Sequence, residues 1–199
     1  MPDTTASEGD TRCGFVALIG APNAGKSTLL NALVGSKVSI VSRKVQTTRA
    51  LIRGIAVAGK SQLIFVDTPG IFAPRRRLDR AMVTTAWSGA QEADLVAVLI
   101  DARKGIDEEA EAILDSLAAV MAPKLLVLNK IDLVAKEALL GLAQAANDKT
   151  TFQTTFMISA LTRDGVGDLE AWLAEYVPPG PWLYPPDQIS DAPLRQLAA

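Results

Sequence analysis

Short apolar runs alternate along the chain with longer segments in which alanine and leucine recur at helical spacing. The apolar runs, which predict strands, are 14–20, 51–58, 62–67, 94–101, 124–129 and 154–159. The segments with helical spacing, which predict helices, are 26–35, 78–92, 107–121, 135–147 and 166–177. Strands that are apolar on both faces and alternate with helices indicate an α/β fold of three layers around a mostly parallel sheet.

One connection does not fit a parallel sheet. Only 59-GKS-61 separates the second and third predicted strands, and a three-residue link that contains glycine can only join antiparallel neighbours. We therefore expect a sheet of six strands, one of them antiparallel to the others, flanked by about five helices.

The composition limits the kinds of protein that this chain can be. With 199 residues, of which 49% are hydrophobic, the chain can bury one substantial core, and a second full domain would be cramped. The net charge of −2 provides no overall positive field for nucleic acid. The single Cys13 excludes an internal disulfide and a multi-cysteine zinc site, and the absence of histidine excludes a Ser-His-Asp triad.

The two ends of the chain differ from its middle. Residues 1–13 are polar and acidic, unlike a signal peptide, and no apolar run approaches the ~18 residues of a membrane span. We therefore expect a soluble, cytosolic protein with a flexible tail at 1–13 and one globular domain at 14–177. Six of the eleven prolines lie in 178–199, which predicts an extended linker. Ser190 or Asp191 can cap a further helix, so we expect the natural protein to be longer.

The stretch 20-GAPNAGKST-28 lies between the first predicted strand and the first predicted helix. It contains the pattern Gly-x-x-x-x-Gly-Lys-Ser, whose glycines let backbone N–H groups converge on phosphate oxygens while the helix dipole favours negative charge. Lys26 is placed to reach the β and γ phosphates, and Ser27 to ligate Mg²⁺. The stretch predicts a nucleoside triphosphate site; the alternative is a glycine-rich turn without a ligand.

Three further motifs follow predicted strands. In 67-DTPG-70, Asp67 can hold the Mg²⁺ shell and the Gly70 N–H can meet the γ-phosphate, although these residues also suit a turn. In 129-NKID-132, Asp132 can accept the ring N–H and the exocyclic amine of guanine, whereas adenine would leave that buried carboxylate unpaired. In 159-SAL-161, the Ala160 N–H can donate to the guanine carbonyl oxygen.

The order of the motifs is GAPNAGKS, 47-TTR-49, DTPG, NKID and SAL. This set resembles the five signatures of translation-factor-class P-loop GTPases, and 36-SKVSIVSRKVQTTR-49 together with GAPNAGKSTLLNALVG is similar to the Era family within that class. The resemblance covers roughly residues 14–177. It implies a P-loop NTPase fold of the Ras-like G-domain type that binds GTP or GDP together with Mg²⁺.

The resemblance also implies roles for individual residues. The implied catalytic residues are Asn23, Lys26, Thr48, Asp67 and Gly70, and the implied Mg²⁺ ligands are Ser27, Thr48 and Asp67. The residues implied to hold the nucleotide are Ala21, Asn23, Ala24, Gly25, Lys26, Ser27, Thr28, Asn129, Lys130, Asp132, Ser159, Ala160 and Leu161. Thr48 is implied to complete the Mg²⁺ shell only when the γ-phosphate is present, so that hydrolysis releases the first switch.

The residue after the DTPG motif is apolar. Ras-like proteins place there a glutamine that orients the attacking water, and Ile71 cannot do so by hydrogen bonding. We therefore expect slow intrinsic GTP hydrolysis. Asn23 matches the asparagine through which related GTPases coordinate K⁺, which implies stimulation by K⁺; alternatively, Asn23 only stabilises the turn.

The resemblance implies a molecular switch that hydrolyses GTP during maturation of the small (30S) ribosomal subunit. Era-family proteins carry a C-terminal KH domain that binds 16S rRNA, and residues 178–199 match the linker toward it, but no KH domain follows in this chain. RNA binding by this chain is therefore expected to be weak or absent. The resemblance further implies a cytoplasmic monomer and leaves peripheral association with the inner face of the cell membrane open.

Two other classes of function stay open. A P-loop kinase shares the phosphate-binding pattern, and the run Arg75–Arg77 could serve as its arginine lid, but a kinase needs no guanine-reading Asn-Lys-x-Asp. A binding module that holds GTP or GDP without appreciable turnover is compatible with Ile71. Release of phosphate over many turnovers separates an enzyme from such a module.

Overall fold

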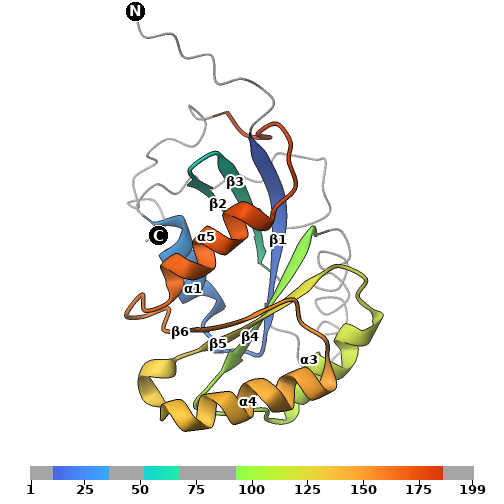
Figure 1. The fold of residues 1–199 in the computed structure, drawn as a ribbon, viewed down its shortest axis with the longest axis vertical. Helices are drawn as coiled ribbons and strands as arrows, with labels where there is room; N and C mark the ends of the chain where they lie inside the picture. Colours follow the sequence, from blue (N-terminus) through green and yellow to red (C-terminus); the bar gives the residue numbers. More distant parts are fainter. Residues whose placement is uncertain (1–10, 36–51, 68–92, 186–199) are drawn as a thin grey trace, which may run out of the picture.

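The computed structural model describes residues 11–35, 52–67 and 93–185, which form a three-layer α/β fold (Figure 1). The strands are β1 (Arg12–Gly20), β2 (Ile52–Ala58), β3 (Ser61–Asp67), β4 (Leu95–Asp101), β5 (Lys124–Asn129) and β6 (Thr155–Ile158). They form one sheet in the order β2-β3-β1-β4-β5-β6, in which only the pair of β2 and β3 is antiparallel. The predicted fold class is confirmed.

Four α-helices lie within the described residues. They are α1 (Lys26–Val34), α3 (Glu108–Ser116), α4 (Lys136–Lys149) and α5 (Val166–Tyr176), and the short 3-10 helices are η1 (Leu117–Ala119) and η2 (Ile131–Leu133). The predicted helix at 78–92 lies outside the described residues. None of the helices in the described ranges is long and apolar enough to cross a bilayer.

Most elements differ from their predicted bounds by one or two residues, and two differences are informative. The link between β2 and β3 has two residues, Gly59 and Lys60, because Ser61 already pairs with Ala58, and Gly59 supplies the positive φ of 60° that a two-residue hairpin turn needs. The predicted helix 107–121 is shorter, since α3 gives way to η1 after Ser116. Its start agrees with the prediction, because the Asp107 carboxylate caps α3 by accepting from the Ala110 N–H at 2.9 Å.

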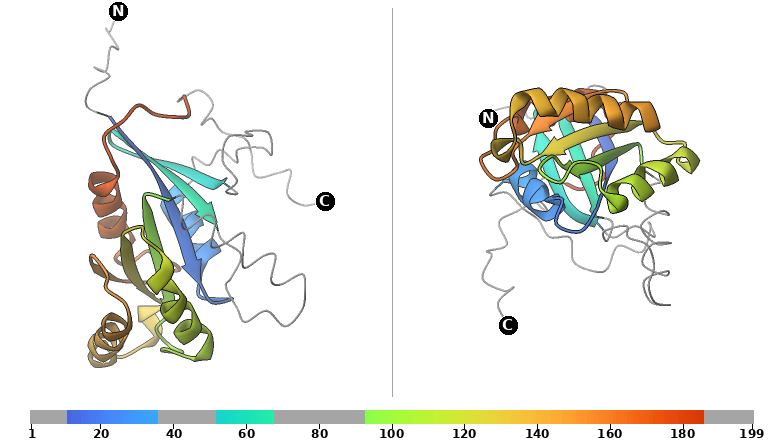
Figure 2. Two further views of the ribbon diagram at one scale, coloured as in Figure 1. Left: turned by 90° about the vertical axis from the view of Figure 1, so that its right-hand side faces the viewer. Right: turned by 90° about the horizontal axis from the view of Figure 1, so that it is seen from below.

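The two helical layers follow from the alternation of side chains along the strands. In β1, Val16 and Leu18 pack on the face that α1 and α5 cover, whereas Ala17 and Ile19 pack on the face of α3 and α4. Figure 1 shows each pair of helices, and Figure 2 shows the twisted sheet from the side with its strands fanned apart. Because helices cover both faces, the central strands β1 and β4 are apolar on both faces apart from polar residues at their ends, such as Arg12 and Asp101.

The strand order places the first loop at the centre of one edge of the sheet. β1 is hydrogen-bonded to β3 on one side and to β4 on the other, so the chain crosses β1 between these two strands. All strands except β2 are parallel, so their carboxyl ends lie at one edge, which holds Gly20, Asp67, Asp101 and Asn129. Open α/β sheets bind their ligands at such a reversal of strand order.

The chain that follows α5 is held at the opposite edge of the sheet. The Gly180 N–H donates to the Thr11 carbonyl, and the Thr11 hydroxyl donates to the Gly180 carbonyl, both at 2.9 Å. The buried Gln62 of β3 accepts through Oε1 from the N–H groups of Leu183 and Tyr184 at 3.0 and 3.1 Å, and its Nε2 donates to the Tyr184 carbonyl at 2.8 Å. Residues 178–185, predicted as the start of a linker, therefore pack against the sheet.

We predict that Gln62→Ala destabilises the fold. It removes the partner of two backbone N–H groups, and an unsatisfied polar group of this kind costs about 1–3 kcal/mol, so the free energy of unfolding should fall by about that amount. Urea denaturation followed by circular dichroism measures this change. The control is Gln144→Ala, because Gln144 is exposed and its change should stay within about 0.5 kcal/mol. Equal effects of the two substitutions would contradict the role of Gln62.

Candidate nucleotide-binding site

Residues 21–25 connect β1 to α1 and hold two left-handed backbone conformations. The φ angle is 63° at Asn23 and 100° at Gly25. Glycine adopts this region without steric cost, and asparagine tolerates it better than most residues do. A Cβ on Gly25 would also overlap Nδ2 of Asn129. The shape of the loop therefore requires a glycine at position 25. The left-handed backbone at position 23 is by itself a sufficient reason for an asparagine there.

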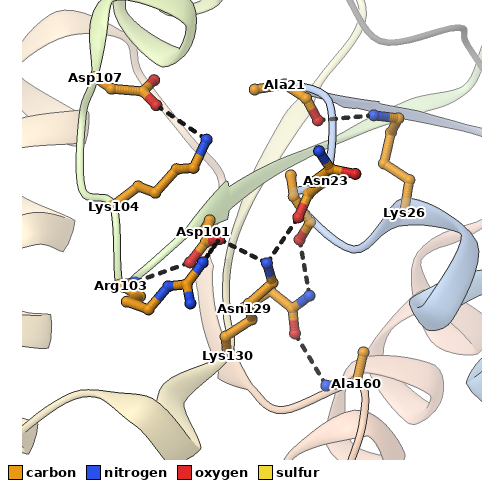
Figure 3. A network of polar contacts seen from close by, with 11 residues as sticks. Ala21, Asn23, Lys26, Asp101, Arg103, Lys104, Asp107, Asn129, Lys130 and Ala160 are labelled. Atoms are coloured by element: carbon orange, nitrogen blue, oxygen red, sulfur yellow. Dashed lines mark hydrogen bonds and ion pairs between the residues drawn. The ribbon is translucent and has the colours of Figure 1, made fainter.

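The Lys26 side chain folds back over the loop (Figure 3). Its Nζ donates to the carbonyls of Gly20 at 2.8 Å and Ala21 at 3.0 Å. These two acceptors are neutral carbonyls, whereas a phosphate oxygen carries negative charge and attracts the ammonium more strongly. A phosphate in the loop therefore offers the ammonium a better acceptor close to where it already lies.

The N-terminus of α1 suits an anion. The N-cap residue is Gly25, which provides no side-chain cap, and the first turn of the helix contains no acidic residue. Ser27 and Thr28, the second and third residues of α1, are exposed at this end of the helix. Uncapped N–H groups and the positive end of the helix dipole together favour a phosphate at this position.

Asn129 joins the phosphate-binding loop to the last predicted motif. Its side chain is buried, and Nδ2 donates to the Ala24 carbonyl while Oδ1 accepts from the Ala160 N–H, both at 2.9 Å (Figure 3). The amide therefore links loops that follow β1, β5 and β6. The Ala160 N–H, which is predicted to bond guanine, donates to Asn129 here, so its bond to guanine stays a prediction.

Lys130 makes a second link to the same loop. Its Nζ donates to the Asn23 carbonyl at 2.7 Å and lies 2.6 Å from Oδ2 of Asp101 (Figure 3). The backbone of Lys130 is left-handed, with a φ angle of 69°. The carboxylate at the end of β4 and the carbonyl in the phosphate-binding loop thus hold one ammonium between them.

Asp101 is a buried carboxylate with several partners. Besides Lys130, its Oδ1 accepts from the Arg103 N–H at 3.0 Å, and the Arg103 guanidinium lies 3.8 Å from Oδ2. Burial alone would raise the pKa of Asp101, but the hydrogen bond and charge of Lys130 and the contacts of Arg103 outweigh it and lower the pKa below its ordinary 3.8. The ionised carboxylate therefore stabilises the fold near neutral pH, and this contribution is lost as the pH falls through the lowered pKa.

The residues expected to read the base lie beside these links. Asp132 lies in η2 and is exposed, in contrast to the buried carboxylate predicted from its motif, and Leu161 is exposed as well. Ser159 is buried, and its Oγ accepts from the Thr162 N–H at 3.2 Å, which closes the turn after β6. Arg163 fixes this turn to α1 by donating to the Ala32 carbonyl at 2.8 Å.

The predicted Mg²⁺ ligands are only partly described. Ser27 lies in the first turn of α1, and Asp67 ends β3, where its neighbour Leu18 belongs to β1. Thr48, Gly70 and Ile71 lie outside the described residues. Serine hydroxyls and aspartate carboxylates are the hard oxygen ligands that Mg²⁺ prefers, so the residue types at positions 27 and 67 suit the ion.

Sequence reasoning missed Asp101. The available signal is the same one that marks Asp67 and Asn129, namely a polar residue directly after an apolar strand. Asp101 pairs with Asn129 in the register of β4 and β5, so the two side chains leave the sheet from neighbouring positions. No motif contains Asp101, and its main partner, Lys130, comes from a loop 29 residues away in the sequence.

Comparison with known families decides which class of protein has this site. A family model described as "50S ribosome-binding GTPase" matches residues 15–130, which is more than half of the chain. The chain belongs to this GTPase family. It is 71% identical over 194 residues to GTPase Era of Bradyrhizobium sp. (strain ORS 278), a match that covers 98% of this chain and 63% of that protein. The resemblance to Era is therefore confirmed.

Solved structures of Era are similar to this GTPase-family chain. An Aquifex aeolicus Era variant bound to GDP and AlF4⁻ is 37% identical, with a TM-score of 0.75 over 93% of this chain and 64% of that one. Era in complex with MgGDPNP and nucleotides 1506–1542 of 16S ribosomal RNA is 38% identical, with a TM-score of 0.77 over 93% of this chain and 63% of that one. The chain thus spans less than two thirds of the length of these relatives.

We predict that Gly25→Ala abolishes tight nucleotide binding. A residue other than glycine at this φ angle is strained by about 1–3 kcal/mol, and the added methyl group must displace the Asn129 amide, so GDP should bind at least about tenfold more weakly. Titration with a fluorescent GDP measures the change.

The matched control for this substitution is Gly141→Ala. Gly141 lies inside α4, and a Cβ there meets no other atom, so the same chemical change should leave GDP affinity unaltered and slightly stabilise the helix. Unchanged GDP affinity in Gly25→Ala would show that the loop does not hold phosphate in the geometry described.

Proposed function

We propose that this chain binds GTP with Mg²⁺ and hydrolyses it to GDP and phosphate, as a molecular switch in maturation of the small (30S) ribosomal subunit. The observation that carries the proposal is the Asn129 amide, which joins a phosphate-binding loop to a loop suited to guanine. The family match to GTPases and the high identity to GTPase Era support the same reading, whereas nothing in them supports a kinase.

Lys26 and the N-terminus of α1 would hold the phosphates. The Lys26 ammonium would exchange the carbonyls of Gly20 and Ala21 for phosphate oxygens, and the uncapped helix would supply N–H groups from Lys26, Ser27 and Thr28. When bound at Ser27, Thr48 and Asp67, Mg²⁺ supplies positive charge against the β and γ phosphates. The Gly70 N–H would report the presence of the γ-phosphate.

Asp132 would select guanine. Its carboxylate accepts two hydrogen bonds from the ring N–H and the amine of guanine, and a base stacked on η2 would remove the water that now reaches this exposed side chain. A base without those donors would leave a charge unpaired, which is costly. Asn129 and Lys130 would act mainly by placing Asp132 beside the phosphate-binding loop.

Two features set the expected rate. Ile71 provides no hydrogen bond to orient water, so we propose slow intrinsic hydrolysis. The Asn23 side chain is exposed at the rim of the loop, where it is free to ligate K⁺ through its oxygen. A nucleotide-dependent binding module with negligible turnover is the alternative that Ile71 favours.

The proposed partner of the whole protein is 16S rRNA within the small subunit. Support comes from Era in complex with MgGDPNP and a fragment of 16S ribosomal RNA, to which this chain is similar. The proposal includes a cytoplasmic monomer, and it leaves peripheral association with the inner face of the membrane open.

We predict that phosphate release is specific for GTP over ATP. Asp132→Asn should lose GTP hydrolysis and gain activity with xanthosine triphosphate, because an asparagine amide donates to the carbonyl that replaces the guanine amine. A phosphate-release assay with all three nucleotides measures this exchange, and repeating it in K⁺ and in Na⁺ buffer tests Asn23.

The control is Asp148→Asn, which removes an exposed carboxylate on α4 and should leave the nucleotide preference unchanged. Equal use of GTP and ATP would refute the guanine site. Single-turnover release without further cycles would favour the binding module, and equal rates in K⁺ and Na⁺ would remove the proposed role of Asn23.

A further inference from the structure

Asp101 is a buried ionised group that the proposed hydrolysis does not use. Its side chain is 4% exposed, and its two oxygens are divided between different partners. Oδ1 accepts from the Arg103 N–H, a contact within its own loop, whereas Oδ2 faces the Lys130 ammonium at 2.6 Å. A buried carboxylate is costly unless it is paired, so the second contact needs a reason.

Lys130 is the cation that this carboxylate depends on. Arg103 is the other nearby cation, but its guanidinium lies farther away at 3.8 Å and its side chain is 58% exposed. Lys104 is directed toward Asp107, with 3.8 Å between the charged atoms. The 2.6 Å pair with Lys130, whose side chain is only 26% exposed, is therefore the dominant interaction.

The ion pair also reaches the phosphate-binding loop. The ammonium that Asp101 holds donates to the Asn23 carbonyl at 2.7 Å, and Asn23 adopts a left-handed backbone conformation there. The next residue, Ala24, is held by Asn129, which precedes Lys130 in the chain. Asn129 and Lys130 thus bind two consecutive carbonyls of the phosphate-binding loop. Asp101 holds the ammonium that makes the second of these contacts.

We propose that Asp101 is a positioning residue for nucleotide binding, which holds Lys130 against the Asn23 carbonyl and so keeps the phosphate-binding and guanine-reading loops in register. This inference rests on the proposed function. Such preorganisation reduces the ordering that the ligand must bring about, so it acts on affinity. Within the described part of the chain, the side chain of Asp101 contacts Arg103 and Lys130, and neither belongs to the motif expected to meet the γ-phosphate, so it acts on GTP and GDP alike.

The first experiment compares substitutions of Asp101 and Asp94, which lie at the two ends of β4. Asp101→Asn keeps the size of the side chain and an oxygen for the Arg103 N–H, but it removes the charge that holds Lys130. Asp94, just before β4, accepts from the Phe15 N–H at 2.8 Å at the opposite end of the strand, so Asp94→Asn is the matched control. Stopped-flow release of a fluorescent GDP and melting temperature are measured for each variant.

We expect GDP to dissociate about tenfold faster from Asp101→Asn than from the wild type, which corresponds to about 1.4 kcal/mol, and at an unchanged rate from Asp94→Asn. The affinity for a non-hydrolysable GTP analogue should fall by the same factor. The rate of hydrolysis at saturating GTP should change by less than about twofold, because the interaction is the same in ground and transition states.

A double-mutant cycle separates positioning from a general structural role. Lys130→Met keeps the stem of the side chain and removes the ammonium, so Asp101→Asn should have no further effect on GDP dissociation in that background. A merely structural role would give additive effects, and this outcome would overturn the inference. If Asp101→Asn does not fold, Asp101→Ser, which also retains an acceptor oxygen, replaces it in the cycle.

The outcomes also separate this inference from the function on which it rests. If wild-type protein releases GDP slowly and Asp101→Asn releases it at the same rate, the positioning role fails and the GTPase proposal stands. If wild-type protein does not bind GDP above the level of ADP, both fail together. Faster release from Asp101→Asn with non-additivity toward Lys130→Met supports both.

Discussion

The geometry of the candidate site depends on one buried amide. Asn129 is 2% exposed, and each polar end of its side chain meets a backbone group from a different loop, the Ala24 carbonyl and the Ala160 N–H. If one of these two partners were missing, one end of the buried amide would be unsatisfied, and this would destabilise the fold. Each loop therefore constrains the other, and the positions suited to phosphate and to guanine become parts of one site.

The sheet places that amide. Asn129 ends β5 and pairs with Asp101 of β4 on one side and with Ile158 of β6 on the other. Because these strands are parallel, the loops that follow them leave the sheet at the same edge. The left-handed conformations of Asn23, Gly25 and Lys130 gather at that edge as well, where the hydrogen bonds of Asn129 and Lys130 can offset the strain.

Much of this arrangement can be predicted from the sequence. Apolar runs locate the strands to within two residues, because strands covered on both faces leave few polar positions. The motifs identify Lys26 and Asp132 as candidate site residues, because each motif is a short stretch of consecutive residues that directly follows a strand. Motifs name a residue by its order in the chain, however, and not by its partners.

The remaining features depend on contacts between distant parts of the chain. Asn129 is predicted to hold the nucleotide, whereas its amide is bound at both ends by protein groups. Asp101 belongs to no motif, and its partner Lys130 lies 29 residues away. The linker prediction for 178–185 follows from proline content and overlooks Gln62, whose partner Tyr184 lies 122 residues away in the chain. Composition and periodicity contain no information on such pairs.

The most direct test of the account is amide hydrogen exchange at Ala160 in the nucleotide-free chain. If Asn129 joins the two loops without help from nucleotide, the Ala160 N–H exchanges slowly in the wild type and rapidly in Asn129→Ala. The Leu126 N–H, which bonds the Thr154 carbonyl, should stay protected in both proteins and serves as the internal reference. Equally rapid exchange at Ala160 in both proteins, with Leu126 protected, would contradict the account.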